Sequence, residues 1–218
     1  IPDVSSWDWA GAAEKNRDFI HQGLATSFVI HNGLLERLAA MMGMGEALVA
    51  LVDEDLQPSV HRLFSRICDI YEEIICNANK WFDIDIIWFH DDWGSQMSSL
   101  VSPETCREMI VPYLKRISDC AHRNGLYLEL HSCGKIENLV PCMIEAGVDA
   151  WRGQSLNNKQ MLFEKYGDKI LLGIEPTDLP PQTEDMEQLE KDCRGFVNRY
   201  TPSGRVYSSM FRMPPKAR

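Results

Sequence analysis

The hydrophobic positions of this chain alternate between short β-rich runs and longer runs with helical spacing. The strand-like runs are 26–30, 85–89, 126–130, 148–152, 170–174 and 205–210. The main helical runs between them are 34–42, 57–79, 103–122, 136–146, 159–166 and 184–200. Strict alternation of strands and helices is typical of a parallel sheet with helices packed outside it. The pattern therefore predicts an α/β protein.

Two architectures fit this alternation, a (β/α)8 barrel and a doubly wound sheet. The sequence has no G-x-G-x-x-G after any strand-like run, which disfavours a dinucleotide-binding fold. A complete barrel typically takes about 250 residues. Six visible strand units in 218 residues therefore favour one TIM-type barrel domain over 1–218 that lacks its first one or two βα units.

Composition limits the binding partners and the cellular compartment that we expect for this protein. The formal net charge of −10 disfavours nucleic acid as a partner, because phosphate binding needs clustered Lys and Arg. No apolar run approaches the 18 residues of a membrane helix, and no signal peptide pattern is visible. The seven cysteines include no pair at C-x-x-C spacing. We therefore expect a cytoplasmic protein with reduced thiols and no membrane contact.

Polar residues are concentrated where the strand-like runs end. Among them, the pair His131 and Cys133 is the most specific candidate for a functional site. Strand side chains alternate between faces, so residues two apart share a face. A His nitrogen and a Cys thiolate on one face can both bind a zinc ion. The alternative is a buried cysteine beside a hydrogen-bonded histidine, without a metal.

The run His90-Asp91-Asp92-Trp93-Gly94 is the second candidate. Adjacent carboxylates on a strand point to opposite faces, so only one of the two aspartates is expected at the site. That carboxylate would act as a general base, orient His131 or bind metal. The alternative is a loop that caps the helix beginning near Ser102. The further candidates are Glu129 and Glu175 as catalytic carboxylates and His90, Trp93, Gln96, Gln154 and Tyr207 as substrate-binding residues.

The motifs HDDWGSQ, SPETCREMIVPYLKRISDCAHRNG and HSCGKIENLVPCMIEAGVDAW resemble the uroporphyrinogen decarboxylase superfamily, and most closely its corrinoid-dependent methyltransferase branch. The resemblance covers about 27–210 and implies a (β/α)8 barrel with a zinc site. His131 and Cys133 match the family's His-x-Cys ligands. The third ligand of that branch is a Cys on the last strand, which is absent from 205–210. Glu129, Glu175 and Asp91 are carboxylates that would replace it.

The resemblance implies a zinc-assisted methyl transfer between a corrinoid carried by a partner protein and a thiol or a methylated small substrate. Trp93, Gln96 and Trp151 are candidates for the partner contact, with burial in the core as the alternative. The open edges of an incomplete barrel lead us to expect a longer native protein or a homodimer.

Two other functions stay open at this stage. One is decarboxylation of a tetrapyrrole or a smaller acid, although 1–23 contains a single arginine, Arg17, where decarboxylases of the family carry an Arg-rich motif. The other is a noncatalytic barrel that only binds a corrinoid protein.

Overall fold

The structure, a computed structural model, describes residues 2–18, 20, 23–174 and 186–207. The chain divides into two compact units, residues 1–157 and 158–218. The assignment of 1–218 to a single domain stays a prediction. The first unit contains η1 (Val4–Ser6), α1 (Trp9–Lys15), β1 (Ser27–Ile30), α2 (Leu34–Met42), α3 (Met44–Ala50), α4 (Gln57–Phe82), β2 (Ile86–His90), α5 (Pro103–Met109), α6 (Val111–Arg123), β3 (Tyr127–Ser132), η2 (Glu137–Leu139), α7 (Val140–Glu145) and β4 (Ala150–Gly153). The second contains α8 (Lys159–Tyr166), β5 (Leu171–Gly173), α9 (Met186–Tyr200), η4 (Thr201–Ser203) and β6 (Val206–Tyr207).

The strands of the first unit form a parallel sheet in the order β1-β2-β3-β4. In the second unit β5 pairs with β6, also in parallel. The predicted parallel α/β architecture is therefore confirmed. Closure into a barrel stays a prediction.

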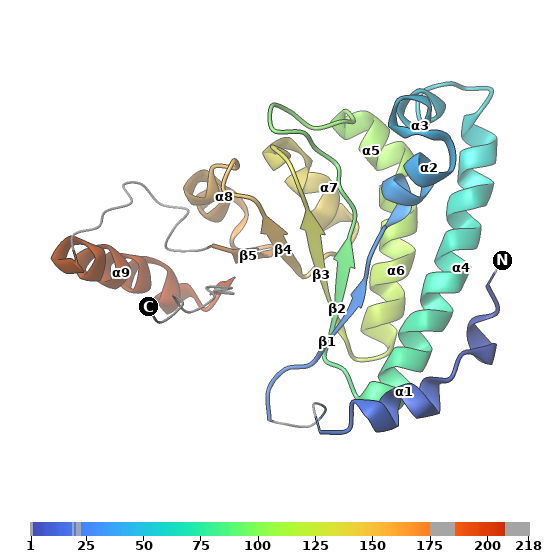
Figure 1. The fold of residues 1–218 in the computed structure, drawn as a ribbon. Coiled ribbons are helices and arrows are strands. Elements are labelled where there is room, and N and C mark those ends of the chain that lie inside the picture. Colours follow the sequence, from blue (N-terminus) through green and yellow to red (C-terminus); the bar gives the residue numbers. More distant parts are fainter. Residues whose placement is uncertain (1, 19, 21–22, 175–185, 208–218) are drawn as a thin grey trace, which may run out of the picture. The chain divides into compact units, whose positions relative to one another are not determined.

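Helices α4 and α6 lie side by side along one face of the first unit's sheet (Figure 1). The strand residues facing them, among them Ile87, Phe89, Leu128 and Leu130, have no exposed surface. Because side chains alternate along a strand, their neighbours point to the other face. That second face is polar and aromatic, and it carries Trp88, His90, Glu129, His131 and Arg152. Helices α2 and α5 lie at the end of the sheet where the strands finish (Figure 1).

The region predicted as one helix over 103–122 contains two helices. Helix α5 ends at Met109 and α6 begins at Val111, with Pro112 in the first turn of α6. Proline has no N–H, and its ring clashes with the carbonyl four residues earlier, so it kinks or breaks a helix that would continue through it. The predicted start is confirmed, because the Ser102 hydroxyl accepts a hydrogen bond from the Thr105 amide at 3.1 Å.

Two short helices, α1 and α3, were not predicted from the sequence. Trp9 of α1 is buried, and its ring contacts those of Trp7, Phe28 and Phe82. These contacts join residues far apart in the chain, so local periodicity does not reveal them. Among the described residues, no helix combines the length and the apolar character that crossing a bilayer requires.

Candidate metal centre

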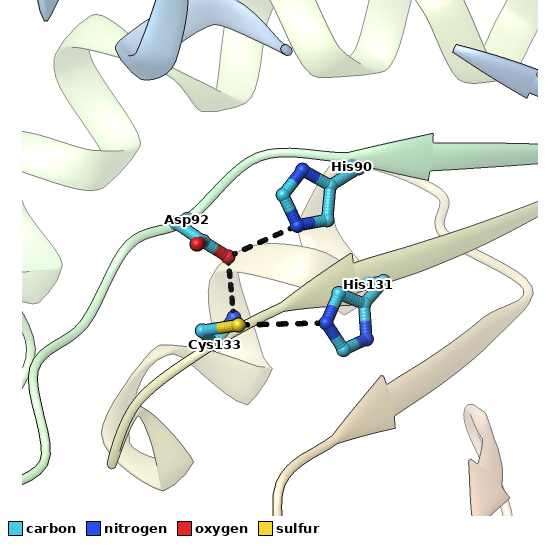
Figure 2. Close-up of side chains that lie close together, drawn as sticks. All are labelled: His90, Asp92, His131 and Cys133. Atoms are coloured by element: carbon cyan, nitrogen blue, oxygen red, sulfur yellow. Dashed lines mark hydrogen bonds and ion pairs between the residues drawn. The ribbon is translucent and has the colours of Figure 1, made fainter. Parts of the chain in front are cut away.

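Four side chains converge just beyond the carboxyl ends of β2 and β3. His90 pairs in register with His131 across these two strands. Asp92 follows His90 by two residues, and Cys133 follows His131 by two residues. Strand alternation therefore sends all four side chains to one face, where Figure 2 shows them pointing toward one another.

The distances within this cluster are short. The four ligand atoms, one from each side chain, all lie within 4.8 Å of one another. His90 Nε2 is 3.3 Å from Asp92 Oδ1, and Cys133 Sγ is 3.6 Å from His131 Nε2. The two imidazole rings stack with their centroids 5.1 Å apart and their planes 12° from parallel. Both strands thus contribute two donors to one small volume.

Burial shifts the pKa values of two side chains of the cluster. Burial, followed by a weaker effect of the neighbouring His90, lowers the pKa of His131, which favours the neutral imidazole that metals bind. Burial, with a hydrogen bond to Asp92, raises the pKa of the Cys133 thiol to about 11. Cys133 is therefore a neutral thiol at pH 7 and would lose its proton when it binds a metal.

Asp91 points away from this cluster and is completely buried. Its carboxylate accepts hydrogen bonds from the backbone amides of Leu34, Leu35 and Glu36 at 3.0–3.1 Å and from the Trp93 indole at 2.9 Å. These amides form the first turn of α2, whose N-cap is Gly33 and lacks a side chain to cap them. Burial outweighs these hydrogen bonds and raises the pKa of Asp91 to about 6. The contacts of Asp91 favour a role as the cap of α2.

The loops after β2 and β3 hold each other in place. The Trp93 amide donates to the Ser132 hydroxyl at 2.9 Å, and the Cys133 amide donates to Asp92 Oδ1 at 2.7 Å. Gly134 has a φ of +95°, and a Cβ there would lie 2.3 Å from the Gly94 carbonyl carbon. The two loops therefore approach as closely as they do only because both positions are glycine.

The loop after β4 makes hydrogen bonds to the loop after β3 and helps to hold it in place. Gln154, predicted to bind substrate, accepts a hydrogen bond from the Gly134 amide through Oε1 at 2.9 Å. Buried Asn157 accepts from the Ile136 amide and donates to the Gly134 carbonyl. Gln154 thus orients the loop that carries Cys133.

None of the other predicted site residues that the structure describes is one of the four clustered donors. Glu129 lies on the same face, where its carboxylate pairs with Arg152 at 2.9 Å. Gln96 is exposed in the loop after β2. Trp93 and Trp151 have no exposed surface, so the structure supports the alternative that both belong to the core. Tyr207 lies in β6 of the second unit, and Glu175 lies outside the described residues.

From the sequence, His90 was expected to bind substrate, one of Asp91 and Asp92 was expected to act as a base, orient His131 or bind metal, and Glu36 was not identified. The alternation that linked His131 to Cys133 also links His90 to Asp92, so this signal was available in the sequence. Glu36 carries no comparable signal. It reaches His90 only because β1 pairs beside β2 and α2 starts directly after β1.

Comparison with known proteins identifies the family. The sequence profile of uroporphyrinogen decarboxylase (URO-D) matches residues 38–217. A solved methyltransferase from Methanosarcina mazei has a similar fold, with a TM-score of 0.54 and 17% identity over 76% of this chain. This chain spans 47% of that protein's length. A search of curated proteins gave no match. Since the profile covers most of its length, the chain belongs to the uroporphyrinogen decarboxylase family.

Proposed function

We propose that His90, Asp92, His131 and Cys133 bind one zinc ion, and that this protein is a methyltransferase of the corrinoid-dependent branch of its family. The observation that carries the proposal is the convergence of the four ligand atoms within 4.8 Å. Both histidines, the carboxylate and the thiol are ordinary zinc ligands. The set differs from the one expected from sequence in two ways. His90 was considered for substrate binding and not as a ligand, and of the two neighbouring aspartates it is Asp92, and not Asp91, that joins the cluster.

Two of the six donor-to-donor distances match the edges of a tetrahedral site, and all six are within 4.8 Å. Ligand bonds of about 2.0–2.3 Å place neighbouring donors of a tetrahedron about 3.3–3.8 Å apart. The Asp92–His90 and Cys133–His131 pairs, at 3.3 and 3.6 Å, match such edges. The donor set of two nitrogens, one sulfur and one oxygen therefore fits zinc without a Cys on the last strand.

A catalytic zinc site keeps one position for substrate, and Asp92 is the donor best placed to vacate it. Its Oδ1 already accepts the Cys133 amide hydrogen, so this carboxylate has a second partner when it leaves a metal. Its side chain is also 31% exposed, against 19% for His90. His131 and Cys133 are held by the β3 backbone and its loop and would remain in place.

The bound zinc would supply Lewis acidity, either to polarise a methylated substrate or to lower the pKa of a substrate thiol. The chain's own residues beside the zinc would hold and orient the substrate, among them Trp88, whose ring contacts that of His131. The methyl group would move to or from a corrinoid on a partner protein. The similar fold of a protein described as a methyltransferase supports this choice over decarboxylation.

The proposal is tested first by the metal content of the purified protein. We expect about one zinc per chain in the wild type, a loss of most of it in Cys133→Ala, and wild-type content in Cys76→Ala, which removes an exposed thiol elsewhere. Zinc-supplemented wild type that binds no metal would overturn the proposal.

Methyl transfer is tested with free methylcobalamin as donor and a panel of thiols as acceptors, followed by cobalamin absorbance. We expect demethylation by the zinc-loaded wild type and its loss in Cys133→Ala. Zinc binding without any demethylation, together with release of CO2 from a tetrapyrrole acid, would favour the decarboxylase instead.

A further inference from the structure

Glu36 lies beside the candidate metal centre, on the helix that follows β1. Its carboxylate Oε2 is 3.0 Å from His90 Nδ1, while His90 Nε2 faces Asp92 at 3.3 Å. The side chains of Glu36 and His90 are only 18% and 19% exposed. His90 thus has a carboxylate at each ring nitrogen, and only one of these two carboxylates belongs to the four-residue cluster.

Contacts of the first turn of α2 with Asp91 fix the position of Glu36. Its backbone amide donates to Asp91 Oδ1 at 3.0 Å, and the preceding Leu34 and Leu35 are fully buried. A Cβ on Gly33 would lie 2.4 Å from Asp91 Cβ, so α2 starts in close contact with β2. Asp91 therefore anchors the turn that carries Glu36, while the same turn presents the Glu36 carboxylate to His90.

We propose that Glu36 is a positioning residue for the metal centre: it accepts the Nδ1 hydrogen of His90 and thereby directs the lone pair of Nε2 toward Asp92, His131 and Cys133. The inference rests on the proposed function. An imidazole that binds metal through one nitrogen needs its proton on the other, and a carboxylate at that nitrogen fixes both the tautomer and the ring orientation. It also makes the imidazole a stronger donor.

The geometry distinguishes this role from that of a fifth ligand. Glu36 contacts Nδ1 of His90 and Asp92 contacts Nε2, so the two carboxylates lie at opposite nitrogens of the ring, and Glu36 is not one of the four clustered donors. The burial of the pair also distinguishes it from an exposed surface ion pair, which solvent would screen.

The experiment titrates Co²⁺ into the metal-free protein and follows its visible absorption in wild type, Glu36→Ala, Glu36→Gln and the control Glu46→Gln. Glu46 is an exposed glutamate on the next helix, α3. We expect Glu36→Ala to weaken Co²⁺ binding about 10- to 100-fold. Glu36→Gln should weaken it less, since the amide oxygen still accepts the Nδ1 hydrogen. Glu46→Gln should bind as wild type does.

A second readout is the tautomer of His90 by ¹⁵N NMR in the protein loaded with Zn²⁺. We expect the proton on Nδ1 in wild type and Glu36→Gln, and a changed or broadened signal in Glu36→Ala. Urea unfolding of each variant shows whether it is folded. A variant that loses Co²⁺ binding because it is unfolded is thereby recognised.

The outcomes separate the two proposals. Wild type that binds no Co²⁺ overturns the metal centre and this inference with it. Wild-type affinity and an unchanged His90 tautomer in a folded Glu36→Ala variant overturn the role of Glu36 alone. Equal losses in Glu36→Ala and Glu36→Gln would also contradict it, because a positioning carboxylate is partly replaced by an amide.

Discussion

Asp91 and Asp92 are neighbours in the chain, but their carboxylates serve different parts of the molecule. Asp91 points into the core and accepts three helix amides and an indole hydrogen. Asp92 is half-buried beside His90 and accepts one amide. The sequence predicted that only one of the pair reaches the site, because strand neighbours point to opposite faces. It did not predict which one, although counting by two from His90 selects Asp92.

This division predicts that the alanine substitution of Asp91 mainly lowers stability and that of Asp92 mainly lowers zinc binding. Asp91→Ala should lower the free energy of unfolding by about 3 kcal/mol or more, since buried donors lose their acceptor at a helix N-terminus. Asp92→Ala should cost about 1 kcal/mol, for one amide, but should weaken zinc binding strongly. Urea unfolding and zinc competition assays measure the two quantities. Equal stability losses in the two variants would contradict the assignment.

At the scale of elements, Arg116 joins the two helices that cover the sheet. From α6 it contacts Asp69 Oδ1 at 2.9 Å and Glu72 Oε1 at 3.0 Å, both on α4. The hydrogen bond from Arg116, more than the one from Arg66, lowers the pKa of Asp69.

This ion pair makes part of the stability depend on pH. Because the folded-state pKa of Asp69 is depressed, its contribution is present above the unfolded pKa of about 3.9 and is lost as pH falls through the folded value. Between about pH 5 and pH 3 the wild type should therefore lose more unfolding free energy than Asp69→Asn. The difference should not exceed about 1 kcal/mol, since the pair is partly exposed. Asp119→Asn, which removes an exposed pair within α6, serves as the control, and an identical pH profile in Asp69→Asn would refute the coupling.

The loops that carry the candidate ligands depend on the close contact between Gly134 and Gly94. Gly134→Ala would put a Cβ 2.3 Å from the Gly94 backbone at a φ of +95°. We expect it to push the loop after β3 away from the loop after β2 and to lower both zinc affinity and stability. Gly125→Ala is the matched control, because Gly125 also has a positive φ, +75°, with no neighbouring atom within 4 Å of the added Cβ. It should cost stability but leave zinc affinity unchanged.

The sequence predicted those elements whose signals are local. Leu34–Met42 and Lys159–Tyr166 have their predicted bounds, because a glycine follows each of them. The break between α5 and α6 was missed although Pro112 marks it. Helix α1 depends on the aromatic contacts of Trp9, which join distant segments. The same limit applies to the site: H-x-C was found locally, whereas Glu36 reaches His90 only through strand pairing.

At the scale of the whole molecule, the chain spans about half the length of the similar methyltransferase structure. Within residues 2–157, β1 pairs with β2 alone, so its other edge presents backbone groups to a further strand. Val29 on this strand is 37% exposed. Because this chain spans only about half of that length, the methyl donor, the acceptor and the partner of the whole protein are proposals, and each of them rests on the metal centre.

An open strand edge predicts that this chain self-associates. Unpaired N–H and C=O groups on an edge strand pair readily with another chain, and a lysine on that strand opposes such pairing. We expect light scattering to show a mass that rises with concentration toward a dimer in wild type, and a monomer in Val29→Lys. Val197→Lys adds the same charge at a 52% exposed valine of α9 and should behave as wild type. A wild-type monomer at every concentration would refute the predicted homodimer, whereas equal dissociation in both lysine variants would show that net charge, and not the β1 edge, controls the association.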